Sequence, residues 1–143
     1  MGIDTDLGYD HLQLRCTTFN CTAAGQAKEL IEGSVAHIIL LQETKMDQAA
    51  VNDFTAWCSR RSWHVLASAA TPGPTGSAQH LSGGVAIVAK CGLGLRRPEA
   101  GPANSHVVVP ARMVTGMLDI PGGAHLAGRS CVFSPGAGFV CQE

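Results

Sequence analysis

A continuous apolar run at residues 35–41, VAHIILL, is the feature that most limits how this chain can fold. The run has the length of a strand, and it lacks the apolar–polar alternation of a strand with one face in water. Such runs are typical of strands buried on both faces, in a sheet that is covered on each side. The run is also far shorter than the ~20 apolar residues that cross a bilayer. We therefore expect a central strand here, inside a layered domain.

The composition changes near residue 68 and divides the chain into two parts. Eight of the 11 carboxylates lie at or before Asp53, whereas all seven prolines and 13 of the 17 glycines lie at or beyond Thr71. Proline and glycine interrupt regular elements and favour turns. The first part is therefore expected to hold the helices and most of the acidic chemistry. The second part should consist of strands joined by turns.

Local patterns predict the individual elements. Strands are expected where β-forming residues cluster between turn residues, at 12–19, 35–41, 62–67, 83–90, 105–109, 112–120 and 124–133. One helix is expected at 22–33, with Gly33 as its C-terminal stop, and a second from Asp47, which can cap it, to about residue 61. Several apolar residues share one side of the second helix: Ala50, Val51, Phe54, Trp57 and Cys58. Beyond residue 128 the strand pattern weakens.

The order of these elements predicts the fold class. A βαβαβ start followed by a run of strands is typical of an α/β protein, here part of a layered α/β sandwich. With 143 residues, 45% of them hydrophobic and 15% charged, the chain suits one folded domain or one lobe of a larger one, and not a disordered segment.

Charge and cysteine content disfavour several classes of protein: those that bind nucleic acid or membranes over their whole surface, secreted proteins and zinc-binding proteins. A formal net charge of −1 gives no whole-surface attraction for nucleic acid or anionic membrane. Residues 1–10 carry three aspartates and no basic residue, unlike a signal peptide, so an intracellular location (cytoplasmic or nuclear) and no membrane partner are expected. The six cysteines form no C-x-x-C pair, which predicts reduced, mostly buried thiols and not a structural zinc site.

The densest polar cluster, LLQETKMD at residues 40–47, directly follows the apolar run. Open α/β sheets place their sites at the carboxyl ends of central strands. Glu43 could supply a hard oxygen ligand to Mg²⁺, which retains waters and takes phosphate oxygens as further ligands. The alternative is a solvated loop in which Asp47 caps the next helix. The residues alone leave both interpretations open.

Asn20 ends the preceding predicted strand, which should lie beside the apolar one. Its side-chain amide could orient a carboxylate, a metal-bound water or a phosphate oxygen. An asparagine at a strand end is also a common turn residue, so Asn20 gains weight only together with Glu43.

A family resemblance becomes visible in these residues. Asn20 ends the first strand, an apolar strand then runs into LQETK (41–45), and GGVAI (83–87) and RMVTGMLDI (112–120) follow. Over residues 12–120 the series resembles the first half of the endonuclease/exonuclease/phosphatase superfamily, which includes deoxyribonuclease I-like, abasic-site and retrotransposon endonucleases. LQETK is the most specific piece of the resemblance.

The resemblance implies both a fold and an activity. The fold is a two-sheet sandwich flanked by helices, and the reaction is Mg²⁺-dependent hydrolysis of a phosphodiester or phosphomonoester, with Mn²⁺ as a possible substitute for Mg²⁺. Glu43 would be the metal-binding carboxylate, and Asn20 would sit beside the metal and the scissile phosphate. The complete domain would act on nucleic acid, as a nuclease, or on another phosphoester.

The sequence also departs from the family. Where the family has a tyrosine near the phosphate, residues 131–134 (CVFS) offer only Val132 or Phe133. The later Gly-Asp-x-Asn and Ser-Asp-His motifs do not occur in the chain. We therefore expect no catalytic residue here and no hydrolysis by the chain alone. The expected organisation is a tail at 1–11, the first part of such a domain at 12–134, and a tail at 135–143, which leaves the sandwich incomplete.

The remaining polar residues give weaker signals. His37 lies inside the apolar run and is expected to be a hydrogen-bonded core residue. No aspartate lies nearby in sequence to His64, His80, His106 or His125. Two further interpretations stay open. One is a catalytically inactive binding module that self-associates through an exposed sheet face, with the valines at 107–109 contributing. The other is a gene-model fragment without function.

Overall fold

The structure is a computed structural model of the 143-residue chain. It describes residues 15–21, 23–72, 81–97, 105–118, 129–134 and 138–142, and the last two ranges by their backbone alone. No helix within these ranges is long and apolar enough to cross a membrane.

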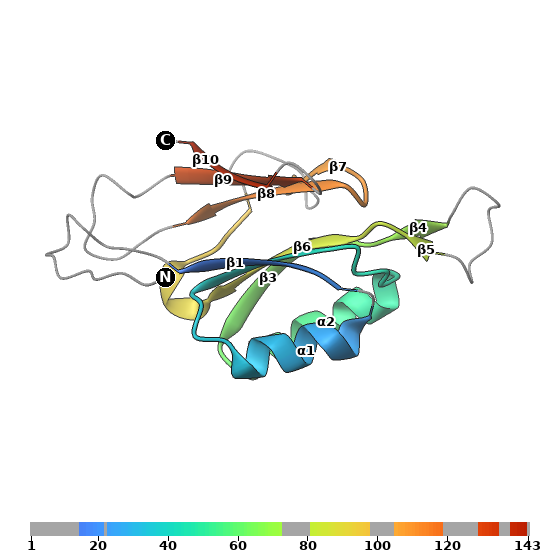
Figure 1. Cartoon of the computed structure of the whole chain (residues 1–143). Coiled ribbons are helices and arrows are strands. Elements are labelled where there is room, and N and C mark those ends of the chain that lie inside the picture. Colours follow the sequence, from blue (N-terminus) through green and yellow to red (C-terminus); the bar gives the residue numbers. More distant parts are fainter. Residues whose placement is uncertain are drawn as a thin grey trace, which may run out of the picture.

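A four-stranded mixed sheet lies at the centre of the molecule (Figure 1). Its strand order is β1-β2-β6-β3, with bounds β1 (Cys16–Asn20), β2 (Ile38–Gln42), β6 (Val85–Lys90) and β3 (Trp63–Ser68). β1 runs parallel to β2, whereas β6 is antiparallel to both β2 and β3. The helices α1 (Ala24–Gly33) and α2 (Gln48–Ser59) cover one face of this sheet.

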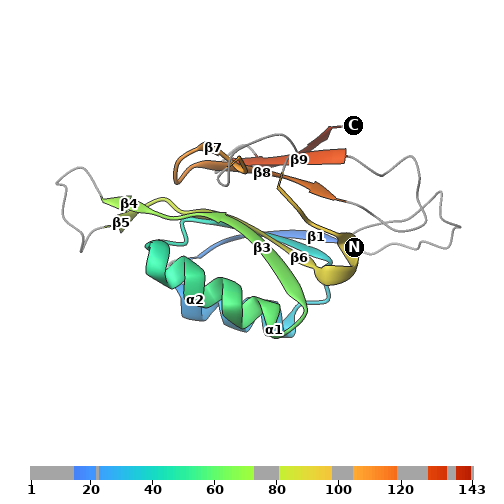
Figure 2. The same ribbon diagram turned by 180° about the vertical axis from the view of Figure 1, so that it is seen from behind.

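A second, antiparallel sheet lies over the opposite face (Figures 1 and 2). Its order is β10-β9-β8-β7, with bounds β10 (Gly138–Gln142), β9 (Arg129–Ser134), β8 (Met113–Leu118) and β7 (Val107–Val109). A two-stranded hairpin of β4 (Thr71–Pro72) and β5 (Leu81–Ser82) projects to one side, and the short helix η2 (Cys91–Leu93) follows β6. The helix–sheet–sheet layering confirms the α/β sandwich expected from the sequence.

Strand β2 is buried on both faces, as its apolar run predicts. Its residues Ile38–Leu41 are each at most 1% exposed. Ile39 and Leu41 pack with the helices, whereas Ile38 and Leu40 pack toward the second sheet. Since neighbouring residues of a strand point to opposite faces, two separate cores account for the absence of alternation in the sequence.

Helix α2 begins and packs as the sequence predicts. The Asp47 carboxylate accepts a hydrogen bond from the Ala50 N–H at 2.8 Å, which satisfies one of the free donors of the first turn. Val51, Phe54 and Cys58 are buried against the sheet, and Ala50 and Trp57 lie at the margin of the same cluster.

The beginning of β2 differs from the expectation. The strand starts at Ile38, and Val35 is 68% exposed. The interpretation of His37 as a core residue was wrong, because it lies half-buried just before the strand, where its Nδ1 accepts a hydrogen bond from the Arg15 N–H at 3.0 Å. Partial burial, with smaller effects from Lys90 and Arg15, lowers the pKa of His37. Hydropathy alone places the start of the strand too early, because it takes no account of the hydrogen bond between His37 and the Arg15 N–H.

The region beyond residue 128 holds more strand structure than its weak pattern indicates. β9 pairs with β8 and with β10 in continuous antiparallel register. Pairing between strands can therefore override a weak local pattern, because each strand gains main-chain hydrogen bonds from its neighbour. At the other edge of this sheet, Val108 and Val109 of β7 are 50% and 43% exposed. Self-association through this sheet stays a prediction.

The Cys58 thiol provides a test of the helix-side core. Cys58 is fully buried, and burial raises its pKa from 9.0 to about 12, against the opposing effects of Lys28 and Arg61. The folded state disfavours the Cys58 thiolate, so the buried thiol contributes its full stability below pH 9.0. This contribution is lost as the pH rises from 9.0 toward 12, because the unfolded chain ionises first. We expect the free energy of unfolding to fall with pH over this range, and to fall less steeply in Cys58→Ala. Urea unfolding at several pH values measures this difference, with Cys16→Ala at an exposed thiol as the control.

Candidate functional site

The polar segment after β2 is held in an unusual backbone conformation. Glu43 and Lys45 have positive φ angles of 53° and 55°, which side-chain-bearing residues adopt rarely. Two hydrogen bonds fix the segment to the residues before β6: Thr44 N–H donates to Gly84 O at 3.1 Å, and Lys45 N–H donates to Gly83 O at 2.9 Å. Thr44 itself is only 1% exposed. The backbone of residues 43–45 is therefore held in place by hydrogen bonds and is not a freely solvated loop.

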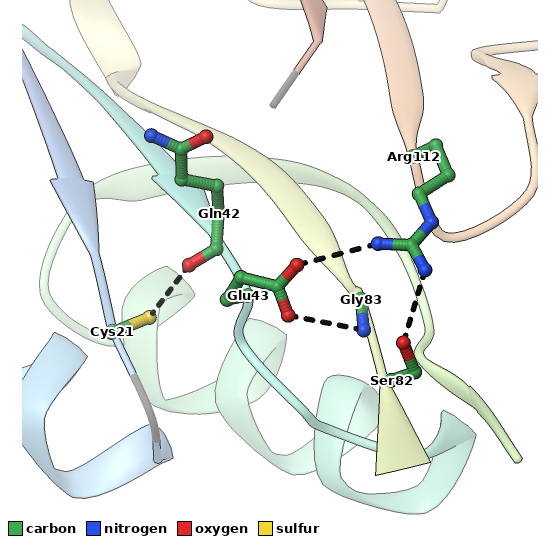
Figure 3. A network of polar contacts seen from close by, with 6 residues as sticks. All are labelled: Cys21, Gln42, Glu43, Ser82, Gly83 and Arg112. Atoms are coloured by element: carbon green, nitrogen blue, oxygen red, sulfur yellow. Dashed lines mark hydrogen bonds and ion pairs between the residues drawn. The ribbon is translucent and has the colours of Figure 1, made fainter. Parts of the chain in front are cut away.

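The Glu43 carboxylate lies in a small polar network (Figure 3). Its Oε2 accepts a hydrogen bond from the Gly83 N–H at 3.2 Å, and its Oε1 lies 3.3 Å from the Arg112 guanidinium. The same guanidinium donates to Ser82 Oγ at 3.0 Å. The side chains of Glu43 and Arg112 remain 31% and 48% exposed. An exposed ion pair of this kind contributes only about 0–1 kcal/mol to stability, so both groups stay available to a ligand.

Arg112 reaches the site because a tight turn between β7 and β8 presents it. Ala111, at the turn, is buried with a positive φ of 64°. Its N–H donates to Ser68 Oγ at 2.7 Å, and its carbonyl accepts from the Gly84 N–H at 2.9 Å. The turn therefore binds to both β3 and the start of β6. Three chain segments, 43–45, 82–84 and 111–112, meet at one place.

Asn20 lies near this network but is not one of its members. As the last residue of β1 it pairs in register with Gln42, the residue that precedes Glu43, and its side chain is exposed. The parallel pairing brings the two predicted site residues to the same edge of the sheet, one register position apart. Among the described residues, the groups that contact the Glu43 carboxylate are Gly83 and Arg112.

The sequence interpretation missed Arg112 and Ser82. Arg112 lies 69 residues beyond Glu43 in the chain, and nothing in the local pattern indicates that the two meet. The pair Gly83-Gly84 was the available signal, because both glycines have positive φ angles, 81° and 95°, and their backbones contact the Glu43 segment.

The Cys21 thiol borders the site and remains protonated. Its Sγ lies 3.7 Å from the carbonyl oxygen of Gln42, to which it donates. Burial raises its pKa, its own backbone hydrogen bond opposes the shift, and the charge of Glu43 adds to it. A thiol held neutral is a poor nucleophile, so Cys21 packs as a small apolar side chain.

The described histidines lie away from Glu43. His37 binds the Arg15 N–H before β2, His64 is exposed on β3, and His106 Nε2 donates to Ala67 O at 2.9 Å. His80 and His125 lie outside the described residues. Within the described ranges, no three His, Cys, Asp or Glu side chains lie close enough to hold a metal ion together.

Comparisons with known proteins return two similar solved structures. No family profile matches the sequence, and no curated protein matches it. The 3′ phosphatase NExo from Neisseria, bound to product DNA hairpin, is 21% identical with a TM-score of 0.47. The 3′-5′ exonuclease NExo from Neisseria meningitidis is 22% identical with a TM-score of 0.46. They cover 74% and 73% of this chain, which in turn spans 38% of each of theirs. Both TM-scores lie below 0.5.

Proposed function

We propose that the site around Glu43 binds Mg²⁺ or Mn²⁺ together with a phosphate ester, and that the chain contributes this site to a phosphoester-hydrolase domain of the endonuclease/exonuclease/phosphatase superfamily. One observation carries the proposal. The Glu43 carboxylate is held beside the Arg112 guanidinium at the carboxyl end of the central strand, within the LQETK motif. A carboxylate and a guanidinium side by side can bind a cation and an anionic ester together.

The donor atoms at this edge fit a hard divalent cation. Glu43 accepts one hydrogen bond on each carboxylate oxygen, which leaves free lone pairs, because an ionised carboxylate has about four acceptor sites. The Asn20 amide lies one register position away and offers a further oxygen. Mg²⁺ is commonly held by one or two carboxylates, substrate phosphates and waters. A site with one carboxylate should therefore bind weakly until a phosphate joins it.

The positive groups suit the phosphate. Arg112 presents five planar N–H donors, which match phosphate oxygens; one on each terminal nitrogen donates to Glu43 or Ser82, and the others can meet a phosphate. The exposed Lys45 follows Glu43 by two residues and adds a second cation. A bound divalent cation would supply charge neutralisation and polarise a phosphoryl oxygen. Nucleic acid is the substrate class that the family resemblance implies.

We further propose that the chain alone does not hydrolyse the ester. Hydrolysis requires a group that activates the attacking water, usually a histidine held by a carboxylate. Of the described histidines, His37 and His106 bind main-chain groups and His64 lies on the far strand β3. The Gly-Asp-x-Asn and Ser-Asp-His motifs are absent from the sequence.

The proposal is tested with a fluorescent DNA hairpin that carries a 3′ phosphate. We expect Mg²⁺ to tighten binding of the hairpin by about tenfold relative to EDTA, which corresponds to 1.4 kcal/mol. Fluorescence anisotropy measures the affinity, and gel analysis with a free-phosphate assay measures turnover. Turnover should not exceed the EDTA blank.

Matched carboxylate variants identify the site. Glu43→Gln should abolish the effect of Mg²⁺, whereas Glu29→Gln, on the exposed face of α1, should leave it unchanged. Equal binding with Mg²⁺ and EDTA would contradict the metal and phosphate assignment and favour an inactive binding module. Turnover that disappears in Glu43→Gln would contradict the proposed inactivity.

A further inference from the structure

A groove made of neighbouring hollows follows the outer edge of β3, the last strand of the central sheet. Three adjoining hollows of about 280, 340 and 470 Å³ line up along this strand. Trp63 borders the first and second hollows, and Val65 borders the second and third. Thr55 and Ser59 of α2 form one wall, and residues 95–97 form the other. Figure 2 shows β3 along the near edge of the sheet, between α2 and the second sheet.

The main chain of β3 presents hydrogen-bonding groups to this groove. Cys91 N–H donates to Ser62 O at 3.0 Å, which fixes the ladder with β6. In an antiparallel pair the bonded residues alternate, so His64, Leu66 and Ser68 also bond to β6. The N–H and C=O groups of Trp63, Val65 and Ala67 therefore point outward. His106 already uses one of them, because its Nε2 donates to Ala67 O.

The groove is basic although the chain as a whole carries a net charge of −1. Six residues with basic side chains border the three hollows, and none of the described residues that line them is an aspartate or glutamate. These six are Arg61, His64, Lys90, Arg96, Arg97 and His106. Arg61 also pairs with Glu32 at 3.6 Å outside the groove, whereas Lys90 and Arg97 contribute permanent positive charge to its lining. The groove therefore attracts an anionic occupant.

We propose that this groove binds an extended acidic peptide segment of a partner protein, added as a strand to the edge of β3. The outward groups of Val65 supply main-chain hydrogen bonds, and the flanking cations supply the preference for Asp and Glu. A groove along β3, with α2 as one wall and residues 95–97 as the other, suits an extended chain, whose side chains alternate between the two walls. Single-stranded nucleic acid fits less well, because it uses exposed aromatic rings for stacking. Trp63 is only 7% exposed and lies beneath Lys90.

The test uses the complete chain and a labelled nine-residue peptide that alternates Glu with Val or Thr. We expect saturable binding that weakens with salt, with the largest ¹H–¹⁵N NMR shifts at the amides of residues 63–67. The same peptide with Gln in place of Glu should bind about tenfold more weakly, since several exposed charge pairs are lost. Shifts that centre elsewhere, or equal binding of the Gln peptide, would overturn the proposal.

Two variants separate the main-chain contribution from the charge. Val65→Pro removes an outward N–H without removing a bond to β6, a position where edge strands tolerate proline, and it should abolish binding. Arg97→Glu should weaken binding about tenfold, whereas Arg15→Glu at the opposite edge should not. Arg97→Glu keeps the test decisive if Val65→Pro unfolds the protein. Tighter binding of a single-stranded oligonucleotide of equal charge to this groove would identify nucleic acid as the occupant and overturn the peptide assignment.

Discussion

Gly84→Ala is expected to lower the free energy of unfolding by about 3 kcal/mol, from left-handed backbone strain and overpacking together. Gly84 has a φ of 95°, a conformation that disfavours any side chain. A methyl group there would also collide with Thr44 Oγ1 and would lie 3.1 Å from Lys45 N. Relief of the collision would push the 43–45 segment away from β6. The variant should therefore also disturb the Glu43 network, which urea unfolding and NMR shifts of the Glu43 and Arg112 amides would reveal.

Two further variants test whether the loss of stability in Gly84→Ala comes from backbone strain or from overpacking. Gly92→Ala is the control, because nothing lies within 4 Å of its added methyl group, and it should change stability by less than about 0.5 kcal/mol. Adding Thr44→Ala to Gly84→Ala removes the colliding oxygen and should recover the part of the loss due to overpacking. If Gly84→Ala is as stable as the original protein, the proposed anchoring of the Glu43 segment is wrong.

The sequence predicts the parts of the fold that depend on neighbouring residues, such as an apolar run or a helix cap. The apolar run predicts a doubly buried β2, and Asp47 with the spacing of Val51, Phe54 and Cys58 predicts α2. The start of β2 and the strands beyond residue 128 depend on contacts between residues far apart in the sequence, so the sequence pattern places them less well. Val35 is apolar but lies outside the sheet, and β10 forms because β9 offers it a partner along its length.

The candidate site shows the same division. Glu43 and Asn20 are marked by their positions at strand ends, and parallel pairing of β1 with β2 brings those ends together. Arg112 and Ser82 could not be assigned, because their place beside Glu43 depends on a turn held by Ser68 and Gly84. Such contacts arise only when the two sheets pack on one another. Residues of this kind need a three-dimensional structure to be found.

Glu43→Gln is expected to weaken the binding of Mg²⁺ and Mn²⁺ by at least about tenfold. The substitution keeps the size of the side chain and the hydrogen bond from Gly83 can persist, but the negative charge is lost. Hard divalent cations prefer charged oxygen ligands, so the amide is a poor replacement. Competition of Mg²⁺ against Mn²⁺, followed by electron paramagnetic resonance, measures both affinities.

Arg112→Ala distinguishes a metal site from a simple ion pair. The guanidinium lies 3.3 Å from Glu43 Oε1 and competes with a cation for that oxygen. Its removal should strengthen binding of the free metal and weaken binding of the 3′-phosphorylated hairpin. If Arg112→Ala weakens both, the arginine acts only by holding the site together, and the assignment of Arg112 to the phosphate is wrong.

The most direct test of the central claim is paramagnetic line broadening in the ¹H–¹⁵N NMR spectrum of the chain with substoichiometric Mn²⁺. The proposed site predicts that the amides of Asn20, Glu43, Gly83 and Arg112 broaden first, that Mg²⁺ reverses the effect, and that Glu43→Gln abolishes it. Broadening that centres on other carboxylates, such as Asp53, or that persists unchanged in Glu43→Gln, would contradict the assignment of Glu43 as the metal-binding residue.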